Sequence, residues 1–536
     1  MNDEKKRRIP RSWTRPVLGA LSGALAGFAA LAVAELVSQW ARPQAGPVVA
    51  VGGAVIDRTP AAVKDWTIRN FGTDDKLVLQ LGILAVLALF ALALGVLALY
   101  RRRYGAAGVL LFGVVGAAAA VSRPDSTGFS DVLPSAAGAV VGAVVLFVLA
   151  GRLETRGGAT ARPDATEEYV PGRQEWDRRG FVLAASAAAA ASAGAAVFGR
   201  VLDGASGRAV ASREDLLLPE PGSPAAAVPA GARLRVPGVS SFITSNKDFY
   251  RVDTALVVPK VDATVWRLRI HGQGVARPVT LSFDDLLKRE LVERDITLTC
   301  VSNEVGGPYV GNARWTGVRL ADLLADCGVE PPSRGGPADQ LVARSVDGMT
   351  IGSPVEDVMD GRDALLAVGM NGEPLPFAHG FPLRMVVPGL YGYVSACKWI
   401  EDLELTTFDA YDPYWITRKW ARSAPIKTQA RIDTPKPFAR PASGTVMVAG
   451  VAWAQHRGVD KVEVRVDDGP WQEARLAAED SRDTWRQWSF PWTASKGGHT
   501  LTVRATDRTG TVQTEKRART MPDGASGRHS VVVTVD

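Results

Sequence analysis

Five long apolar stretches dominate the first 200 residues of this chain. They lie at 17–38, 77–100, 104–122, 132–151 and 180–199, and Glu35 is the only formal charge in them. Each meets or approaches the roughly 20 residues that cross about 30 Å of hydrocarbon. A soluble protein would have to bury five helices that lack a polar face. The sequence therefore predicts an N-terminal transmembrane α-helical bundle over residues 1–202, in which the Ala-rich fifth span is the least hydrophobic.

The charge distribution agrees with a membrane unit rather than with nucleic-acid binding. The chain carries a net charge of +6, and residues 1–180 hold 21 Lys/Arg against 15 Asp/Glu, so the rest is formally neutral. With the N-terminus inside, segments 1–16, 101–103 and 152–179 hold 15 basic residues, and segments 39–76 and 123–131 hold 6. This positive-inside bias predicts a multi-pass cell-membrane protein whose residues after about 200 lie on the extracytoplasmic side.

The start of the fifth span allows two interpretations. Arg178 and Arg179, followed by a small-residue apolar run, resemble an internal twin-arginine export signal, and they also suit positive-inside anchors. Under the export interpretation, the following domain would cross the membrane already folded with its cofactor. None of the five histidines lies in a span, so the bundle is not expected to bind haem through histidine.

The remainder divides into a linker and two folded regions. Residues 203–235 are rich in Ala, Pro and Gly and are typical of a linker. From 236 to 430, strand patterns at 264–272 and 295–300 alternate with helical patterns at 282–291 and 320–329, which indicates a mixed α+β domain.

From 431 to 536 the pattern is strands only. Val462, Val464 and Val466 alternate with charged residues, and 529–535 forms a last strand. This region predicts an immunoglobulin-like β-sandwich. Its tryptophans are expected to lie in the core or at a subunit interface.

The chemistry-bearing residues fall in three segments of the α+β domain. Cys300 ends a strand and leads into a loop rich in Gly, Asn and Ser. Residues 381–405 carry Arg384 and Lys398, and residues 245–262 carry Asn246, Tyr250 and Arg251. Fixed cations and glycine-rich backbone suit a phosphate-bearing ligand, and a thiolate suits a soft metal. Three cysteines are too few for an iron–sulfur cluster. Together the segments indicate a metal–phosphate cofactor.

These segments, LTCVSNEVGG, GNARWTGVRLADLL and PLRMVVPGLYGYVSACKWI, resemble the molybdopterin-binding domain of the sulfite oxidase family. The resemblance covers roughly 240–536, including a C-terminal domain similar to that family's dimerisation domain. It implies a Mo-molybdopterin cofactor with Cys300 as the catalytic thiolate ligand of molybdenum. It further implies pterin or phosphate contacts from Asn246, Phe249, Tyr250, His379, Arg384, Ser395 and Lys398. Because Lys398 is one residue later than the family spacing, the contact could come from Ser395, Ala396 or Lys398.

The resemblance implies two-electron oxygen-atom transfer at a sulfur or nitrogen centre. Sulfite oxidases hold their dianion with arginines, where this chain has Glu304 and Val305. A carboxylate there repels sulfite, although Arg251 and Arg314 could compensate. Reduction of a small or protein-bound S- or N-oxide is therefore favoured, with sulfite oxidation as the alternative.

Two further functions and several partners complete the expectations. Cys300 with His379 could form the nucleophile and base of a cysteine hydrolase. The chain could also be a non-enzymatic anchored binding protein built on the β-sandwich. For the oxidoreductase, electrons are expected to pass to or from a separate partner, and the C-terminal domain could form a homodimer. Cys327 and Cys397 are expected to be packing residues.

Overall fold

The computed structural model describes residues 14–41, 43–59, 63, 75–123, 126, 128–154, 177–202 and 204–536. The chain divides into two compact units, Met1–Ala205 with Thr254–Val257, and Ser206–Asp253 with Val258–Asp536. Much of segments 1–16, 39–76 and 152–179, on which the predicted topology depends, lies outside the described residues. The direction of insertion therefore stays a prediction.

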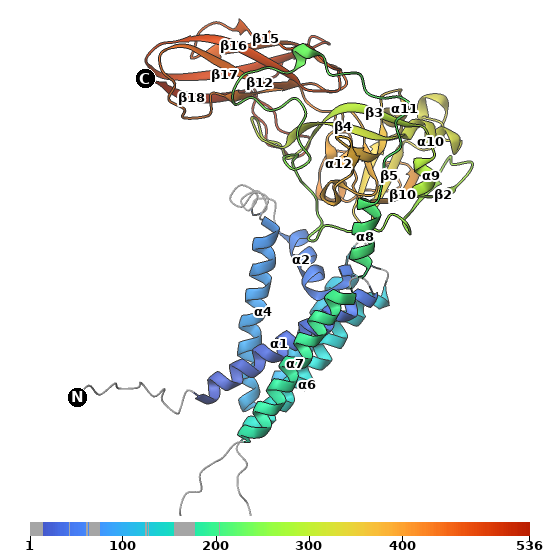
Figure 1. Cartoon of the computed structure of the whole chain (residues 1–536), viewed down its shortest axis with the longest axis vertical. Helices are drawn as coiled ribbons and strands as arrows, with labels where there is room; N and C mark the ends of the chain where they lie inside the picture. The colour runs from blue at the N-terminus through green and yellow to red at the C-terminus, as the bar shows by residue number, and fades with distance from the viewer. Residues whose placement is uncertain are drawn as a thin grey trace, which may run out of the picture. The chain divides into compact units, whose positions relative to one another are not determined.

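The first unit is helical (Figure 1). Its helices are α1 (Thr14–Ala41), α2 (Pro47–Arg58), α4 (Asp75–Tyr100), α5 (Arg102–Val121), α6 (Leu133–Leu153) and α7 (Arg178–Leu202), with 3-10 turns at Pro43–Ala45 and Phe129–Val132. Within the described residues, four helices are long and apolar enough to cross a membrane: Thr14–Ala41, Leu77–Tyr100, Arg102–Val121 and Phe129–Leu153. They coincide with the first four expected spans. The fifth span, 180–199, is helical in α7 but is not among these four, so its crossing stays a prediction.

Small residues set the contact between α1 and α4. A Cβ added to Gly23 would lie 1.9 Å from the Ala91 carbonyl oxygen, and one added to Gly95 would lie 2.1 Å from the Gly19 carbonyl oxygen. Only glycine permits two helix backbones to approach so closely, which is how apolar helices pack where lipid offers no hydrophobic driving force.

The apolar pattern did not reveal α2, which lies within the predicted outer loop 39–76.

The predicted linker 203–235 is partly structured. Residues Gly204–Glu214 form α8, and Ala230–Ala232 form a 3-10 turn. In α8, Arg213 Nε donates to the Leu375 carbonyl at 2.7 Å and its Nη2 to the Pro374 carbonyl at 2.9 Å. Arg213 therefore holds α8 against the segment that contains Pro374 and Leu375.

Two five-stranded sheets form the α+β region. One has the order β2-β1-β10-β5-β6, and the other has the order β3-β4-β7-β8 with β9 paired to β7. The strands are β1 (Arg267–Gly272), β2 (Val279–Ser282), β3 (Leu291–Thr299), β4 (Val310–Arg319), β5 (Gln340–Ser345), β6 (Thr350–Pro354), β7 (Leu365–Met370), β8 (Glu373–Pro374), β9 (Arg384–Val386) and β10 (Ile400–Thr406). The helices are α9 (Phe283–Leu287), α10 (Leu320–Asp326), α11 (Val355–Met359) and α12 (Gly392–Ser395), with 3-10 turns at Pro332–Arg334, Phe377–His379 and Ile416–Arg418.

The expected helix over 282–291 is shorter than predicted. A capping box between Ser282 and Asp285 starts α9, but the helix ends at Leu287 and β3 begins at Leu291. Leu291 and Val292 therefore belong to a strand that is buried on both faces. A short apolar run of this kind cannot be assigned to a helix or to a buried strand from its pattern alone. The other strand and helix predictions in this domain match β1, β3 and α10 within a few residues.

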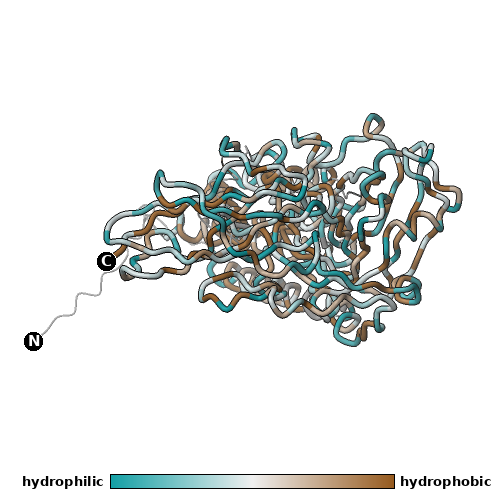
Figure 2. Tube along the Cα trace, turned by 90° about the horizontal axis from the view of Figure 1, so that it is seen from above, coloured by the Kyte–Doolittle hydropathy of each residue, from teal (hydrophilic) through white to brown (hydrophobic). Residues whose placement is uncertain are grey.

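The C-terminal region consists of two four-stranded antiparallel sheets, ordered β11-β12-β16-β15 and β14-β13-β17-β18. Their strands are β11 (Gln429–Thr434), β12 (Gly444–Trp453), β13 (Val459–Val466), β14 (Gln472–Glu473), β15 (Arg475–Leu476), β16 (Arg486–Ala494), β17 (Gly497–Asp507) and β18 (His529–Val535). Apolar residues alternate with polar ones in β13, β16 and β17, and one hydrophobic cluster draws residues from both sheets. Figure 2 shows hydrophobic and hydrophilic residues interspersed along the Cα trace. The immunoglobulin-like assignment stays a prediction.

The tryptophans divide between two cores. Trp488 and Trp492 pack in the cluster between the C-terminal sheets, whereas Trp453 and Trp485 belong to the hydrophobic core of the α+β region. The C-terminal sheets thus share a core with the domain that carries Cys300. Trp471 is half-buried among Arg465, Arg504 and Arg528.

Candidate cofactor site

Cys300 begins the ten-residue loop that joins β3 to β4. The two strands pair in continuous register from Leu291 with Val318 to Thr299 with Val310, and the Cys300 N–H donates to the Tyr309 carbonyl at 2.9 Å. The Ser302 N–H points to the Cys300 Sγ at 3.4 Å. The thiol is buried, and burial raises its pKa above the usual range against opposing hydrogen bonds from Ser302 and the charge of Lys398. A long, regular hairpin therefore presents one buried thiol at its end.

The C-terminal sheets hold the strand that leads into Cys300. Gln455 Nε2 donates to the Thr297 carbonyl at 2.9 Å and to Thr299 Oγ1 at 3.2 Å. The Thr297 N–H donates to the Asp483 carbonyl at 2.9 Å, and the Trp485 N–H donates to Thr297 Oγ1 at 2.7 Å. Because these bonds are buried and short, they restrict movement of the residues directly before the thiol.

The loop after Cys300 is held from the same region. Arg431 Nη1 donates to the Gly307 carbonyl at 2.8 Å. Gly306 has a φ of +80°, and a Cβ there would lie 2.2 Å from His529 Cδ2, so only glycine fits. Glu304, in the middle of this loop, is exposed. The C-terminal sheets thus support the cysteine loop on both sides.

Aromatic side chains line the neighbourhood of the thiol. The Phe249 ring stacks on Tyr250 at 5.1 Å and meets the rings of Trp315 and His379 edge-on at 5.8 and 5.7 Å. Tyr250 contacts Tyr309 at 6.2 Å between ring centroids. Burial, together with the neighbouring Cys300 thiol, raises the pKa of Tyr250 well above its usual range, so this phenol stays neutral.

His379 and Asn246 bind each other rather than the thiol. His379 Nε2 lies 2.9 Å from the Asn246 carbonyl oxygen, and the Asn246 side chain bonds to the Met370 carbonyl and to Asn371. Burial and the charge of Arg384 lower the pKa of His379 to about 4. Among the described residues, no hydrogen bond joins His379 to Cys300. This arrangement does not form the nucleophile–base pair of a cysteine hydrolase.

Arg251, Arg384 and Lys398 lie near these aromatic residues, and two of them share one carboxylate. Lys398 Nζ donates to Asp253 Oδ2 at 2.7 Å, and Arg251 Nε donates to the same oxygen at 2.9 Å. Arg384 lies across an isolated bridge from Lys398, with its guanidinium 5.0 Å from the Trp315 ring centroid. The sequence analysis did not name Asp253, whose side chain is almost fully buried. Its position two residues after Arg251 could have indicated an ion pair between them.

Arg384 is buried and pairs with no carboxylate among the residues that the structure describes. Its Nη1 donates to the His379 carbonyl at 3.3 Å, and its Nε has no hydrogen-bond partner among the described residues. Burial lowers the pKa of Arg384 to about 10. A buried guanidinium with a free donor is costly unless an anion completes it. The donor set is a buried thiol together with three cations, two of which share one carboxylate, and it fits a phosphate-bearing cofactor whose metal takes a sulfur ligand.

Ser395 and Ala396, in the turn 388–396, interact within that turn and not with the charged cluster. Ser395 Oγ bonds to the Leu390 and Tyr391 carbonyls of its own turn, and Ala396 caps α12. Of the three alternatives at this position, only Lys398 joins the charged cluster through its side chain. Cys397, in the same segment, is buried and points to the Ala343 carbonyl at 3.8 Å.

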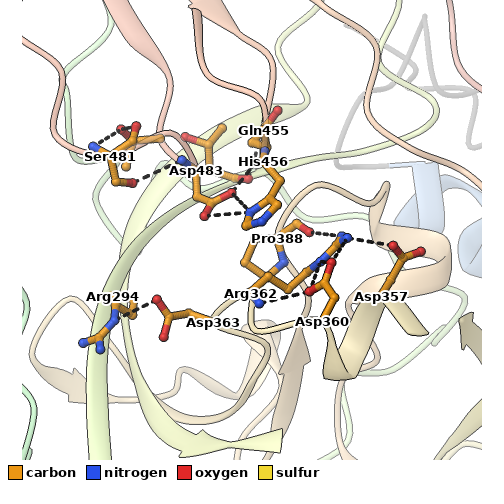
Figure 3. A network of polar contacts seen from close by, with 12 residues as sticks. Arg294, Asp357, Asp360, Arg362, Asp363, Pro388, Gln455, His456, Ser481 and Asp483 are labelled. Carbon is orange, nitrogen blue, oxygen red and sulfur yellow. Dashed lines mark hydrogen bonds and ion pairs between the residues drawn. The ribbon is translucent and has the colours of Figure 1, made fainter. Parts of the chain in front are cut away.

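A polar network fixes that turn (Figure 3). Arg362 Nη1 donates to the Pro388 carbonyl at 2.9 Å, while its Nη2 pairs with Asp357 and Asp360, each at 2.7 Å. Close by, His456 Nδ1 lies 3.1 Å from Asp483, the residue whose carbonyl binds Thr297. The turn and the cysteine strand are therefore both anchored by groups outside the site.

The fold and this cluster define an α+β oxidoreductase domain that binds a molybdopterin cofactor. The family described as "Oxidoreductase molybdopterin binding domain" matches residues 255–415. Rat mitochondrial sulfite oxidase is 31% identical over 293 residues, which cover 47% of this chain and 53% of that protein. The uncharacterized oxidoreductase YuiH of Bacillus subtilis is 35% identical over 145 residues, 27% of this chain and 67% of that protein.

The chain belongs to the sulfite oxidase family of molybdopterin-dependent oxidoreductases. It spans about half the length of the sulfite oxidase it matches. Among solved structures, the sulfane dehydrogenase SoxCD from Paracoccus pantotrophus aligns over 56% of this chain and 84% of that chain, with 24% identity and a TM-score of 0.48.

Proposed function

We propose that this protein is a membrane-anchored molybdenum enzyme that transfers an oxygen atom to or from a sulfur or nitrogen centre. The observation that carries the proposal is a buried thiol and a buried cation that border the same aromatic cluster. Cys300 neighbours Tyr250, and Arg384 lies over Trp315 with its Nε unpartnered within the described residues. When bound, the molybdenum cofactor supplies the two-electron redox chemistry.

The residues of the chain bind and orient that cofactor. As a thiolate, Cys300 would be the sulfur ligand of the metal, and Arg384 with Lys398 would hold the cofactor phosphate. Phe249 and Tyr250 pack against the pterin, and Asn246 and His379 keep the wall of the site in place through their mutual hydrogen bond. Arg251 orients Asp253, which in turn positions Lys398. Ser395 and Ala396 would contact the cofactor only through the backbone of their turn, because the Ser395 hydroxyl binds carbonyls of that turn.

We favour reduction of a neutral S- or N-oxide over sulfite oxidation. Glu304 lies in the loop after Cys300, and both arginines that could offset its charge are engaged by carboxylates. Arg314 forms two bonds of 2.8 Å to Asp295 and lies 3.7 Å from Glu293, and Arg251 binds Asp253. Neither of these two arginines is therefore free to offset the Glu304 charge that a sulfite dianion would meet. Similarity to sulfite oxidases favours sulfite oxidation as the second candidate.

Metal analysis and paired assays test the proposal. The purified full-length protein is expected to contain about one molybdenum per chain. It should reduce sulfoxides, including protein methionine sulfoxide, with an artificial electron donor. Absence of molybdenum from correctly matured protein would overturn the cofactor assignment. Oxidation of sulfite with a KM in the micromolar range would replace the favoured reaction by the second candidate.

The location and the partners form part of the same proposal. We place the catalytic domain on the extracytoplasmic side of the cell membrane, because basic residues concentrate in alternate loops of the N-terminal unit. Electrons would come from a separate membrane or soluble carrier, and the C-terminal sheets could pair two copies. Reporter fusions after residues 103 and 202 test the orientation, since only the second should be active outside the cytoplasm.

A further inference from the structure

A second cluster of metal-ligand side chains lies on β1 and β10. These strands run parallel, with Arg269 opposite Asp402 and His271 opposite Glu404. Leu268, Ile270, Leu403 and Leu405 alternate with them and are fully buried. The strand period therefore sends His271, Asp402 and Glu404 to the other face of the sheet, away from the core.

The three side chains converge. His271 Nε2 lies 2.9 Å from one Asp402 oxygen and 3.2 Å from the other. One ligand atom from each of His271, Asp402 and Glu404 lies within 4.8 Å of the other two. Ligand atoms around a tetrahedral zinc ion lie roughly 3.3 Å apart, given bonds of about 2.0–2.2 Å. Small rotations of half-buried side chains would bring this group to that spacing.

Two further observations favour a ligand here. The Glu404 carboxylate forms no hydrogen bond or ion pair with another described residue, although it neighbours His271. A cavity of about 620 Å³ opens on the same sheet face and is lined by all three residues. It leaves room for water in a fourth coordination position. Arg269 and Arg344 also line the cavity, and their repulsion should keep the affinity for a cation below that of a closed structural site.

We propose that His271, Asp402 and Glu404 form a binding site for one divalent transition-metal ion, with Zn²⁺ as its representative. The ion would join β1 to β10 on the face opposite the hydrophobic core. This site shares no residue with the molybdopterin site and does not depend on the proposed oxidoreductase function.

Zinc binding to the full-length holoprotein, purified without a histidine tag and treated with chelator, tests the proposal. Equilibrium dialysis with Zn²⁺ should give one bound ion per chain, and Zn²⁺ should raise the unfolding temperature. His271→Ala and the nearly isosteric Glu404→Gln should each weaken binding at least tenfold and remove the thermal shift. Molybdenum content should not change in either variant, which separates this outcome from failure of the cofactor assignment.

The matched control is His499→Ala. His499 pairs with Asp467 at 2.8 Å, but this pair is not part of a three-ligand group among the described residues. The control should bind Zn²⁺ as the unchanged protein does. Failure of the unchanged protein to bind Zn²⁺, or equal binding in His271→Ala and Glu404→Gln, would overturn the proposal. Loss of binding in His499→Ala alone would place the ion elsewhere and would also overturn it.

Discussion

Arg314 and Arg384 occupy neighbouring parts of the same domain but have opposite electrostatic surroundings. Arg314 on β4 is bound by Asp295 through two hydrogen bonds and has Glu293 nearby. Arg384 on β9 is more deeply buried, yet it has no described salt-bridge partner. An arginine neutralised by carboxylates stabilises the fold, whereas a buried arginine with an unpartnered donor is suited to bind an anionic ligand.

The largest effect on activity is expected from a change at Cys300. Cys300→Ser should lower turnover by more than about a hundredfold, because even changes beyond the direct metal ligands cost 10- to 100-fold. Cys327→Ser, which changes a buried thiol at the end of α10, is the control and should keep full turnover. Full activity in Cys300→Ser, measured per folded chain, would contradict the assignment.

Arg384→Met should mainly affect cofactor retention. A hydrogen bond to a charged group contributes about 1.5–3 kcal/mol, which corresponds to roughly 10- to 150-fold in cofactor affinity. Molybdenum and pterin content after dialysis measures the effect. If Arg384→Met retained both groups as firmly as the unchanged protein, the distinction between the two arginines would fail.

Arg314→Met should give the reverse result. It would leave the buried Asp295 carboxylate without its partner and lower the free energy of unfolding by about 3 kcal/mol, the lower end of the range for broken buried pairs. Chemical denaturation of the full-length protein in detergent measures this. The folded fraction should still hold molybdenum. If the Arg314→Met protein lost a larger fraction of its molybdenum than the fraction of chains that unfold, Arg314 would belong to the cofactor site instead.

The smallest effect concerns Asp480, a half-buried neighbour of Arg314. Burial and the charge of Asp295 raise the pKa of Asp480 to about 6, against the opposing charge of Arg314. The folded state thus holds this proton more tightly than the unfolded state, so stability falls as pH rises from about 4 through 6. Asp480→Asn should remove that decline and be more stable at pH 8 by about 1 kcal/mol, since solvent screens a half-exposed group. Unfolding curves at pH 4.5 and 8 test this, and an unchanged pH dependence would contradict it.

The sequence was informative where local pattern decides the structure. The strand pattern at 295–300 located the end of β3 just before Cys300, and apolar length located the four helices that could cross a membrane. Glycine, arginine and lysine in three segments predicted a cofactor site in this domain, and the roles of the individual residues stay predictions. The family resemblance then supplied the cofactor that those side chains alone left general.

Other features depend on contacts between distant positions. Asp253 and Lys398 are 145 residues apart, and no local pattern pairs them. The expected contact between His379 and the cofactor stays a prediction, and no local pattern foretold that its Nε2 binds the Asn246 carbonyl 133 residues away. The support of Thr297 by Gln455 likewise crosses from one region to another. Such tertiary hydrogen bonds follow from the assembled fold, and composition or periodicity does not encode them.

The parallel pairing of β1 with β10 has a consequence for the order of events during synthesis. Arg269 cannot meet Asp402 until more than a hundred intervening residues have left the ribosome. Non-local pairing of this kind is slow, because the long loop must close before its contacts form. Lys398, which we propose as a contact of the cofactor phosphate, lies two residues before β10, so it reaches its place in the fold late. The N-terminal apolar helices are synthesised long before that point, and loading of the cofactor must therefore follow their synthesis.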